Sequence, residues 1–259
     1  MSERVRLHHV VVGPPDAQPV LMLHAIGASL EMWSPQIAAL SSVYRVIAAD
    51  LRGHGQSPVP RGPYSVADLA GDAEALLDEL EIERAAICGL SLGAMVGLAL
   101  AGKAPDRVGR LVAACVVAVP AAPMAWLERA SRVRAGGTEA VSDLVVERWG
   151  YANRQPAIAE LIRAMLAATP AAGYAACCDA IAEMDLRPSL PLIGAPTLLL
   201  VGADDPAAPL DAATSIAGAM ADAVVTVIEG AAHLANIEQP DAFTAAIAAH
   251  LGGKSDGPR

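Results

Sequence analysis

Short apolar runs, each bounded by glycine, proline or aspartate, recur along the whole chain. Their centres are rich in valine, isoleucine and leucine over about four to eight residues, which is typical of strands buried on both faces of a parallel sheet. The pattern therefore predicts strands within residues 6–12, 20–24, 44–50, 85–90, 110–119, 196–202 and 223–230.

Helical patterns lie between these runs. Residues 65–80 repeat leucine at a helical spacing, and Ser65 with Asp68 forms the start of a capping box. Similar apolar periodicity is present in residues 92–104, 210–221 and 239–251. Strands that alternate with helices require crossover connections, so the predicted fold class is α/β, with a doubly wound, mostly parallel sheet.

One long segment interrupts the alternation. Residues 121–187 contain helix-like patterns without a convincing strand, after which the sheet resumes at residues 196–202. Long additions at the carboxyl edge of a sheet usually serve the site, so a helical lid is predicted; the alternative is that these helices only pack on the sheet. The predicted division is a core of residues 1–120 and 188–252, the lid at 121–187, and a flexible tail at 253–259.

Composition changes this picture little. Apolar residues make up 54% of the 259 residues, yet much of that share is alanine, and a single phenylalanine is present. The uncharged run between Arg110 and Glu128 is shorter than the roughly 20 residues of a spanning helix, so no membrane span is predicted. Charges at the N-terminus stand where a signal peptide has its apolar core, which favours a cytoplasmic protein.

Cysteine usage and charge narrow the function classes. The four cysteines show no metal-ligand spacing, and Cys177 and Cys178 are adjacent, so a reduced protein without a metal site is expected. The formal net charge of −10 argues against a nucleic-acid partner, which would require a basic face. The sequence alone is compatible with either a monomer or a homo-oligomer.

The stretch GLSLG at residues 89–93 is the one G-x-S-x-G pattern in the chain. It follows a predicted strand and precedes a predicted helix, which is the setting of a nucleophile elbow, where a serine lies on a strained turn and requires small neighbours. Gly89 and Gly93 meet that requirement, and the helix N-terminus directs partial positive charge at Ser91. Ser91 is the candidate nucleophile; the alternative is a glycine-rich turn without chemistry.

A serine hydroxyl needs a base, and the base needs a group that orients it. In this architecture the acid and then the histidine follow the serine along the chain. Two histidines come after Ser91. His233 follows a predicted strand in a loop of small residues, whereas His250 ends a helix, so His233 is the candidate base. Asp205 follows the preceding strand and is the candidate acid, with the adjacent Asp204 as the alternative.

An oxyanion hole would complete this set of catalytic groups. One backbone amide is expected from Leu92, the residue after the nucleophile, and a second from the loop that follows the strand at 20–24. Ile26 is the best candidate there, because Gly27 lets the backbone turn closely. Each donor would supply on the order of 3 kcal/mol of transition-state stabilisation.

Across residues 3–251 the chain resembles the α/β-hydrolase superfamily. Four motifs occur in family order: DLRGHGQS (50–57), GLSLG (89–93), APTLLLVGADDP (195–206) and AAHLANIEQPDAF (231–243). Within the superfamily the chain is most similar to the 3-oxoadipate enol-lactonases of aromatic compound catabolism. The stretches that carry this likeness are IGASLEMWSPQ (26–36), RGHGQSPVPRGPYSVADLA (52–70) and GYAACCDAIAEMDLR (173–187).

The resemblance implies a small lactone or ester as substrate, hydrolysed through an acyl-enzyme on Ser91 with no metal or organic cofactor. A lactone that bears a carboxylate would require a cation in the lid, for which Arg148 is the candidate. Trp33 and Trp149 are expected to wall the pocket. Alternatively, Arg148 is a solvated surface residue, and the two tryptophans belong to the core.

The chain departs from those lactonases in HAIG (24–27), where His24 and Ala25 replace a usual Asn–Ser, and in a compact lid centre at residues 147–161. Both departures lie where substrate would bind, so His24 and Ala25 are predicted substrate contacts. A carboxylesterase, another lactonase or a cofactor-free perhydrolase (haloperoxidase) would share the same triad. A non-enzymatic ligand-binding protein of this fold is the remaining alternative.

Overall fold

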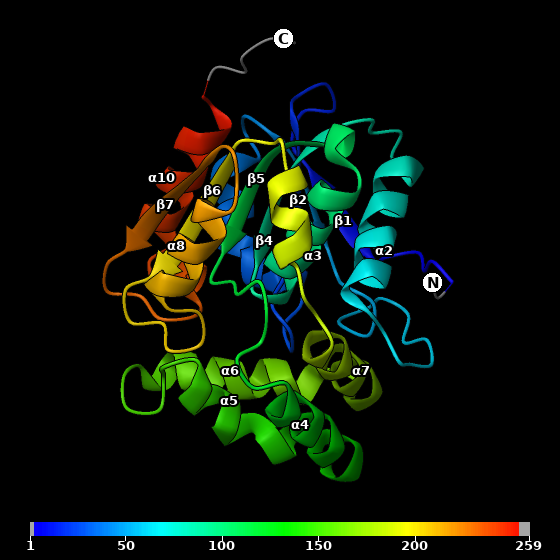
Figure 1. Ribbon diagram of the computed structural model, residues 1–259, viewed down its shortest axis with the longest axis vertical. Helices are drawn as coiled ribbons and strands as arrows, with labels where there is room; N and C mark the ends of the chain where they lie inside the picture. The colour runs from blue at the N-terminus through cyan, green and yellow to red at the C-terminus, as the bar shows by residue number, and fades with distance from the viewer. Residues whose placement is uncertain (1–2, 254–259) are drawn as a thin grey trace.

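The computed structural model describes residues 3–253 and contains a seven-stranded sheet with the order β1-β3-β2-β4-β5-β6-β7 (Figure 1). Neighbouring strands are parallel, except that β1 runs antiparallel to β3 at one edge. The chain winds first to one side of β2 and then to the other, which confirms the doubly wound α/β sheet. The strands are β1 (His9–Val12), β2 (Pro19–Leu23), β3 (Arg45–Ala49), β4 (Ala85–Leu90), β5 (Val108–Ala114), β6 (Thr197–Gly202) and β7 (Ala223–Ile228).

The central strands are buried on both faces, as their unbroken apolar runs predict. Every residue of β4 and β6 is buried, whereas the edge strand β7 leaves Val224 55% exposed. Removing apolar side chains from water stabilises the fold by about 25 cal/mol per Å² of buried area. The buried centre of the sheet is thus a rigid platform, and the loops at its carboxyl edge carry the candidate residues.

Helices cover both faces of the sheet. In Figure 1, α2, α3 and α8 lie in front of the sheet and α10 lies behind it. The predicted capping box is present at the start of α2: the Asp68 amide donates to Ser65 Oγ at 3.1 Å, and the Ser65 amide donates to Asp68 Oδ2 at 3.0 Å. The core helices are α1 (Ser34–Leu40), α2 (Val66–Glu79), α3 (Leu92–Lys103), α8 (Leu210–Gly218), α9 (Ala235–Glu238) and α10 (Pro240–Leu251), with 3-10 turns at Leu30–Trp33, Pro105–Arg107 and Arg187–Leu192.

Four α-helices between β5 and β6 form a cap at one end of the molecule. Figure 1 shows them gathered below the sheet, on the side toward which the arrowhead of β7 points. Within the cap, α4 packs against α7 and α5 packs against α6. The lid predicted at residues 121–187 contains all four: α4 (Pro123–Gly136), α5 (Ser142–Arg148), α6 (Pro156–Ala168) and α7 (Ala171–Ala182), with a 3-10 turn at Thr138–Val141.

The strand predicted within residues 110–119 is shorter than its apolar run. β5 ends at Ala114, which pairs with Leu90 at the end of β4, and Cys115 adopts a left-handed backbone with φ of 49°. The chain therefore leaves the sheet at Cys115, and the apolar residues that follow line a cavity described below. The tail predicted at 253–259 lies, beyond Gly253, outside the described residues.

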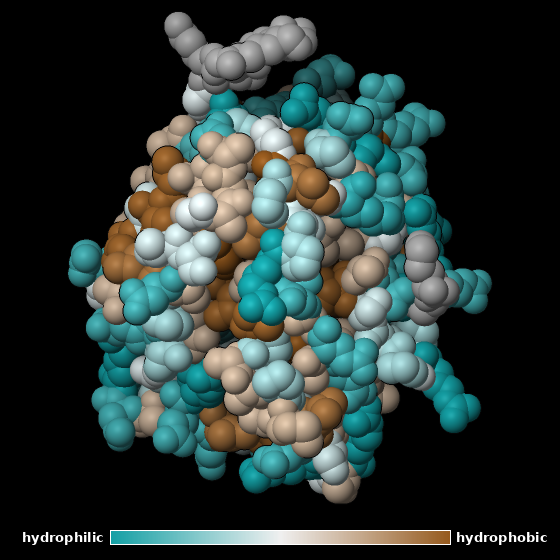
Figure 2. Space-filling model, in the orientation of Figure 1, coloured by the Kyte–Doolittle hydropathy of each residue, from teal (hydrophilic) through white to brown (hydrophobic). Residues whose placement is uncertain are grey.

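The surface on this face of the molecule is mixed. In Figure 2, apolar side chains gather on the side of α8 and β7, whereas polar side chains predominate beside α2. All four cysteines are free thiols and buried. Within residues 3–253 no single helix is long and apolar enough to cross a membrane; the pair α6 and α7 reaches that length and composition together, but it is bent by 105°.

Candidate active site

Ser91 lies on a strained turn between β4 and α3. Its backbone has φ of 54° and ψ of −113°, a conformation that non-glycine residues rarely adopt and that persists only when the surroundings impose it. Two close backbone approaches impose it here. A Cβ at Gly89 would lie 2.3 Å from the Gly93 carbonyl carbon, and a Cβ at Gly93 would lie 2.0 Å from the Leu23 carbonyl oxygen. The predicted elbow geometry is thus present, and both glycines are required by contact.

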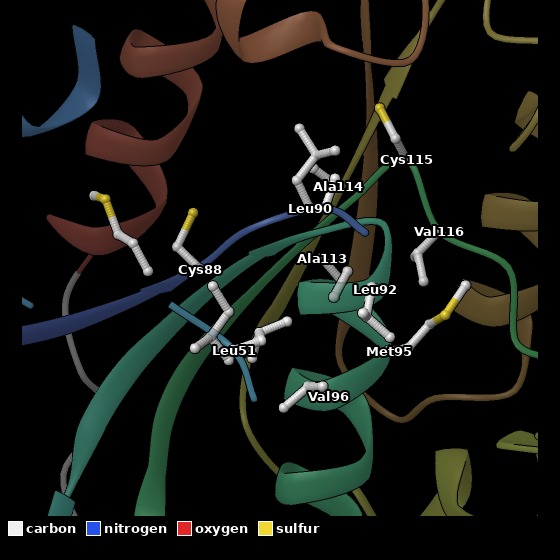
Figure 3. Close-up of a cluster of buried hydrophobic side chains, with 14 of the residues drawn as sticks. Leu51, Cys88, Leu90, Leu92, Met95, Val96, Ala113, Ala114, Cys115 and Val116 are labelled. Atoms are coloured by element: carbon white, nitrogen blue, oxygen red, sulfur yellow. The ribbon is translucent and has the colours of Figure 1, made fainter. Parts of the chain in front are cut away.

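The turn is anchored in a dense apolar cluster. Leu90 and Leu92, on either side of the serine, belong to the buried group drawn in Figure 3 together with Ala114 and Cys115. The Ser91 amide donates to the Ala114 carbonyl at 2.9 Å, which ties the turn to β5. The serine itself is 7% exposed and lines the cavity between the sheet and the cap.

We expect Gly93→Ala to lower the free energy of unfolding by about 1–3 kcal/mol, because the new methyl group overpacks the contact with β2. Gly218→Ala in α8 is the matched control, since a Cβ there has nothing within 4 Å. Removing a glycine at such an open position leaves stability unchanged or raises it by about 0.4–1 kcal/mol. Urea unfolding of both variants checks this, and equal losses would contradict the close approach.

Asp205 and His233 form a buried pair at the carboxyl edge of the sheet. His233 Nδ1 donates to Asp205 Oδ2 at 2.8 Å, and Asp205 Oδ1 accepts from the Ala207 and Ala208 amides at 2.8 and 3.1 Å. Burial by itself would raise the pKa of Asp205, but His233 and these two amides lower it below its usual value. The carboxylate therefore stays ionised and fixes the imidazole with its Nε2 available to accept a proton.

Asp204, the alternative acid, has a different environment. Its side chain is half exposed and pairs with Arg154, away from the His233 ring. The two aspartates lie in a turn that the Asp205 amide closes by donating to the Gly202 carbonyl at 3.1 Å, so one aspartate faces the imidazole and its neighbour faces solvent. The pattern around the two aspartates favours Asp205, and the structure places Asp205 against His233.

Glu238, in α9, holds the His233 loop and was not identified from the sequence. Its Oε2 accepts from the Ala232 amide at 2.7 Å and from the Tyr151 hydroxyl at 2.9 Å, while Oε1 accepts from Arg154 Nε at 2.8 Å. The Tyr151 hydroxyl in turn accepts from the Leu234 amide at 3.1 Å. The two residues that flank His233 are thus both fixed by this carboxylate. A glutamate five residues after the histidine is the only sequence signal for it.

Acidification is expected to weaken this loop. Burial alone would raise the pKa of Glu238, but the groups that donate to it lower its pKa below the usual value. A lowered folded-state pKa contributes stability that is present above the unfolded-state pKa of about 4.3 and is lost as pH falls through the folded-state pKa. We expect Glu238→Gln to show a smaller drop in urea midpoint between pH 6 and pH 3 than the wild type. The exposed Glu229→Gln is the control, and an identical drop in all three proteins would contradict the prediction.

The loop after β2, which carries Ile26, lies against the elbow. The Gly93 amide donates to the His24 carbonyl at 3.0 Å, which ties this loop to the start of α3. The Gly27 amide is occupied by His54 Nε2 at 2.9 Å. The Ile26 amide, in contrast, has no protein acceptor among residues 3–253. Leu92 is the first residue of α3, so its amide has no acceptor within the helix. These are the two amides that the sequence predicts as oxyanion donors.

Two buried neutral histidines shape this loop. His24 Nδ1 donates to the Ala25 carbonyl at 2.7 Å and Nε2 accepts from the Leu51 amide at 2.9 Å. Burial lowers the pKa of His24, and burial together with the nearby His24 lowers the pKa of His54 to about 3. Since His54 Nε2 must accept from the Gly27 amide, the neutral form is the one that the loop requires.

Three predicted substrate contacts do not reach the cavity, and these predictions are corrected. His24 and Ala25 are fully buried and do not line the cavity, and backbone groups engage both nitrogens of the His24 ring. Trp33 is also fully buried, and its ring packs on Phe243 with 6.2 Å between centroids. It belongs to the core, which was the alternative for this tryptophan. A local motif does not reveal which side of a loop its side chains occupy.

A cavity of about 760 Å³ lies between the cap and the carboxyl edge of the sheet. Ser91 and His233 line it, and so do Arg148 and Trp149 from the lid, as predicted. The Trp149 ring lies 5.2 Å from the His233 ring, and the Trp149 carbonyl accepts from the His233 amide at 3.3 Å. The lid thus contributes directly to the wall beside the candidate base.

The cavity wall is cationic, although the chain carries a formal net charge of −10. Arg148 is exposed, and it is joined on the wall by three arginines that sequence reasoning did not single out, Arg129, Arg132 and Arg187, against one acidic residue, Glu128. Arginine at helical spacing in α4 looks like an ordinary solvated face in the sequence. Only the packing of α4 against α7 within the cap buries Arg129 at the cavity wall.

One cluster within residues 3–253 has metal-ligand spacing. Donor atoms of Cys115, Asp205 and His233 all lie within 4.8 Å of one another. Burial, followed by the Asp205 charge, raises the pKa of the Cys115 thiol well above its usual value, so the thiol keeps its proton. A metal requires the thiolate, and it would have to break the Asp205–His233 hydrogen bond. The donor set therefore does not suit a resident metal.

Known proteins share this fold along nearly the whole chain. Residues 18–144 match a family model described as alpha/beta hydrolase fold. A 3-oxoadipate enol-lactonase of Acinetobacter baylyi is 36% identical over 96% of this chain and 94% of its own length. The crystal structure of the enol-lactonase from Burkholderia xenovorans LB400 superposes with a TM-score of 0.90 at 38% identity, covering 95% of this chain and 96% of its own. A thermophilic esterase from Thermogutta terrifontis, solved with malate bound, has a TM-score of 0.89 at 31% identity over 95% and 93% of the two chains.

Proposed function

Because this chain belongs to the α/β-hydrolase family, we propose that it hydrolyses a lactone or another carboxylic ester through an acyl-enzyme on Ser91. One observation carries the proposal: the 2.8 Å hydrogen bond between Asp205 and His233 lies at the wall of the cavity onto which the strained Ser91 turn opens. A nucleophile, an oriented base and a free pair of amides are the parts that acyl transfer needs.

In the first half-reaction, Ser91 Oγ attacks the ester carbonyl carbon while its proton passes to His233 Nε2. Asp205 holds the ring and stabilises the imidazolium that forms. The carbonyl oxygen becomes an oxyanion between the Ile26 and Leu92 amides. These donors act where charge develops, each worth on the order of 3 kcal/mol to the transition state.

Collapse of the tetrahedral intermediate breaks the bond between the carbonyl carbon and the ring oxygen. His233 returns its proton to the leaving oxygen, which in an enol-lactone yields an enol that rearranges to a ketone. A water molecule then gives its proton to His233 and attacks the acyl carbon, which releases the carboxylic acid and restores Ser91. None of these steps calls on a metal or an organic cofactor.

For the substrate we propose 3-oxoadipate enol-lactone or a close lactone analogue. The enol-lactonase relatives in Acinetobacter and Burkholderia support this choice because they match along nearly the whole chain. The volume of about 760 Å³ suits a small ligand, and the arginine-rich wall suits an anionic one. Arg148, exposed at this wall, and Trp149, beside the base, are the lid residues first proposed to contact it.

The test compares turnover of 3-oxoadipate enol-lactone with that of unsubstituted γ-butyrolactone and p-nitrophenyl acetate. We expect kcat/KM to be highest for the enol-lactone and a fluorophosphonate probe to label the wild type at Ser91. Equal rates on all three substrates would overturn the substrate assignment and leave the ester chemistry. Absence of both turnover and labelling would overturn the function itself and favour a ligand-binding protein.

A further inference from the structure

We propose that Arg129 is the anchor for a free carboxylate on the substrate, so that the enzyme selects lactones and esters that carry a second, ionised carboxyl group. This inference rests on the proposed function and adds the feature by which the site would recognise its substrate. In this proposal Arg129, and not the exposed Arg148, binds the carboxylate.

Arg129 is a buried guanidinium with no acidic partner among the described residues, and the polar side chain beside it is the Tyr174 hydroxyl. Arg129 is 6% exposed, and its Nε and Nη1 atoms have no hydrogen-bond partner among the described residues. A buried, unpaired charge is costly, and buried arginines are normally paired with an acid. A donor group left in this state at a cavity wall points to an acceptor that arrives with a ligand.

The position of Arg129 fits that role. It is the seventh residue of α4, and it lines the same cavity as Ser91 and His233. Its guanidinium lies over the Trp126 ring, 4.3 Å from the centroid, on the preceding turn of the helix. This stacking holds the group in place before any ligand binds, and pre-organisation of that kind reduces the entropy cost of binding.

The surrounding charges favour an anion over a neutral group. Arg132 and Arg148 line the cavity without an ion-pair partner among the described residues, and the neighbouring acid on this wall is Glu128. Arg187, also on the wall, already pairs with Asp185. Exposed arginines attract an anion only weakly, because water screens them, whereas the buried Arg129 acts in a lower dielectric. A planar carboxylate also matches the planar fork of a guanidinium.

The experiment uses a matched pair of substrates, the enol-lactone with its free carboxylate and the same lactone with that group converted to a neutral carboxamide. Losing one partner of a buried charged hydrogen bond costs about 2 kcal/mol or more, which is roughly 30-fold in kcat/KM. We expect the wild type to prefer the carboxylate by at least that ratio. Arg129→Met is expected to bring the ratio to within about threefold of unity, since it removes the charge but keeps an unbranched stem.

Arg134→Met is the matched control. Arg134 lies on the same helix and carries the same charge, but it pairs with Asp179 and does not line the cavity. We expect this variant to keep the wild-type ratio. A loss of preference equal to that of Arg129→Met would overturn the anchor and indicate a general effect of charge on the helix.

A measurement on the wild type keeps the test valid if Arg129→Met fails to fold. Adipate, its neutral diamide and inorganic phosphate are compared as inhibitors of p-nitrophenyl acetate hydrolysis. Inhibition by adipate that is at least 30-fold stronger than by the diamide supports the anchor, and equal inhibition overturns it. Stronger inhibition by phosphate than by adipate would show a phosphate site and overturn the carboxylate assignment. If the wild type turns over both lactones equally, Arg129 is not a carboxylate anchor, but the proposed hydrolase function stands. If the wild type turns over neither lactone and is not labelled by fluorophosphonate, the proposed function itself fails.

Discussion

Ser91→Ala is expected to lower kcat for ester hydrolysis by about 10⁴- to 10⁶-fold while leaving the fold intact. The substitution removes the nucleophile, so the acyl-enzyme cannot form. Water attack assisted by the oxyanion donors would account for the small rate that remains. The elbow backbone already places Ser91 at φ of 54°, and alanine differs from serine there only in the missing hydroxyl.

Steady-state kinetics and fluorophosphonate labelling check this result together. Ser215→Ala is the matched control, because Ser215 also lines the cavity but lies in the ordinary helical backbone of α8. We expect the control to keep its rate within about threefold and to be labelled like the wild type. A folded Ser91→Ala protein that retains more than about 1% of the rate, or that is still labelled, would rule out Ser91 as the nucleophile.

Asp205→Asn is expected to lower kcat by about 10³- to 10⁴-fold. The Asp205 carboxylate accepts from His233 Nδ1 at 2.8 Å and so selects the tautomer whose Nε2 can take a proton. An asparagine amide can donate to Nδ1 instead, which stabilises the wrong tautomer, and it lacks the charge that balances an imidazolium. The second oxygen can still accept from the Ala207 and Ala208 amides, so the loop should keep its shape.

Asp204→Asn separates this role from a general effect of charge. Asp204 is the neighbouring residue, and its partner is Arg154 at the surface. Exposed ion pairs are worth about 0–1 kcal/mol, so we expect kcat to change by less than about fivefold. Measuring kcat for both variants, with circular dichroism to confirm folding, decides between the two aspartates. A larger loss in Asp204→Asn than in Asp205→Asn would assign the acid to the other residue.

The apolar pattern was sufficient to predict the sheet because burial on both faces leaves a direct trace in the sequence. β4 and β6 are unbroken apolar runs, and both are buried throughout. The prediction was least accurate where one apolar run forms both a strand and the wall of the cavity. The stretch after Ala114 looks like more strand, but Cys115 turns out of the sheet and the residues beyond it line the cavity. Hydrophobicity is the same for a core and for an apolar binding site, so the run alone does not separate them.

The sequence by itself determined the sheet, the elbow around Ser91, and the order in which Asp205 and His233 follow it, because these depend on local backbone chemistry and on strand ends that share one edge. Only the tertiary structure decided which side chains face the cavity. It buried His24 and Trp33 in the core, joined Glu238 to the His233 loop, and turned Arg129 inward with no acidic partner among the described residues. Such contacts join segments far apart in the chain, and no local pattern encodes them.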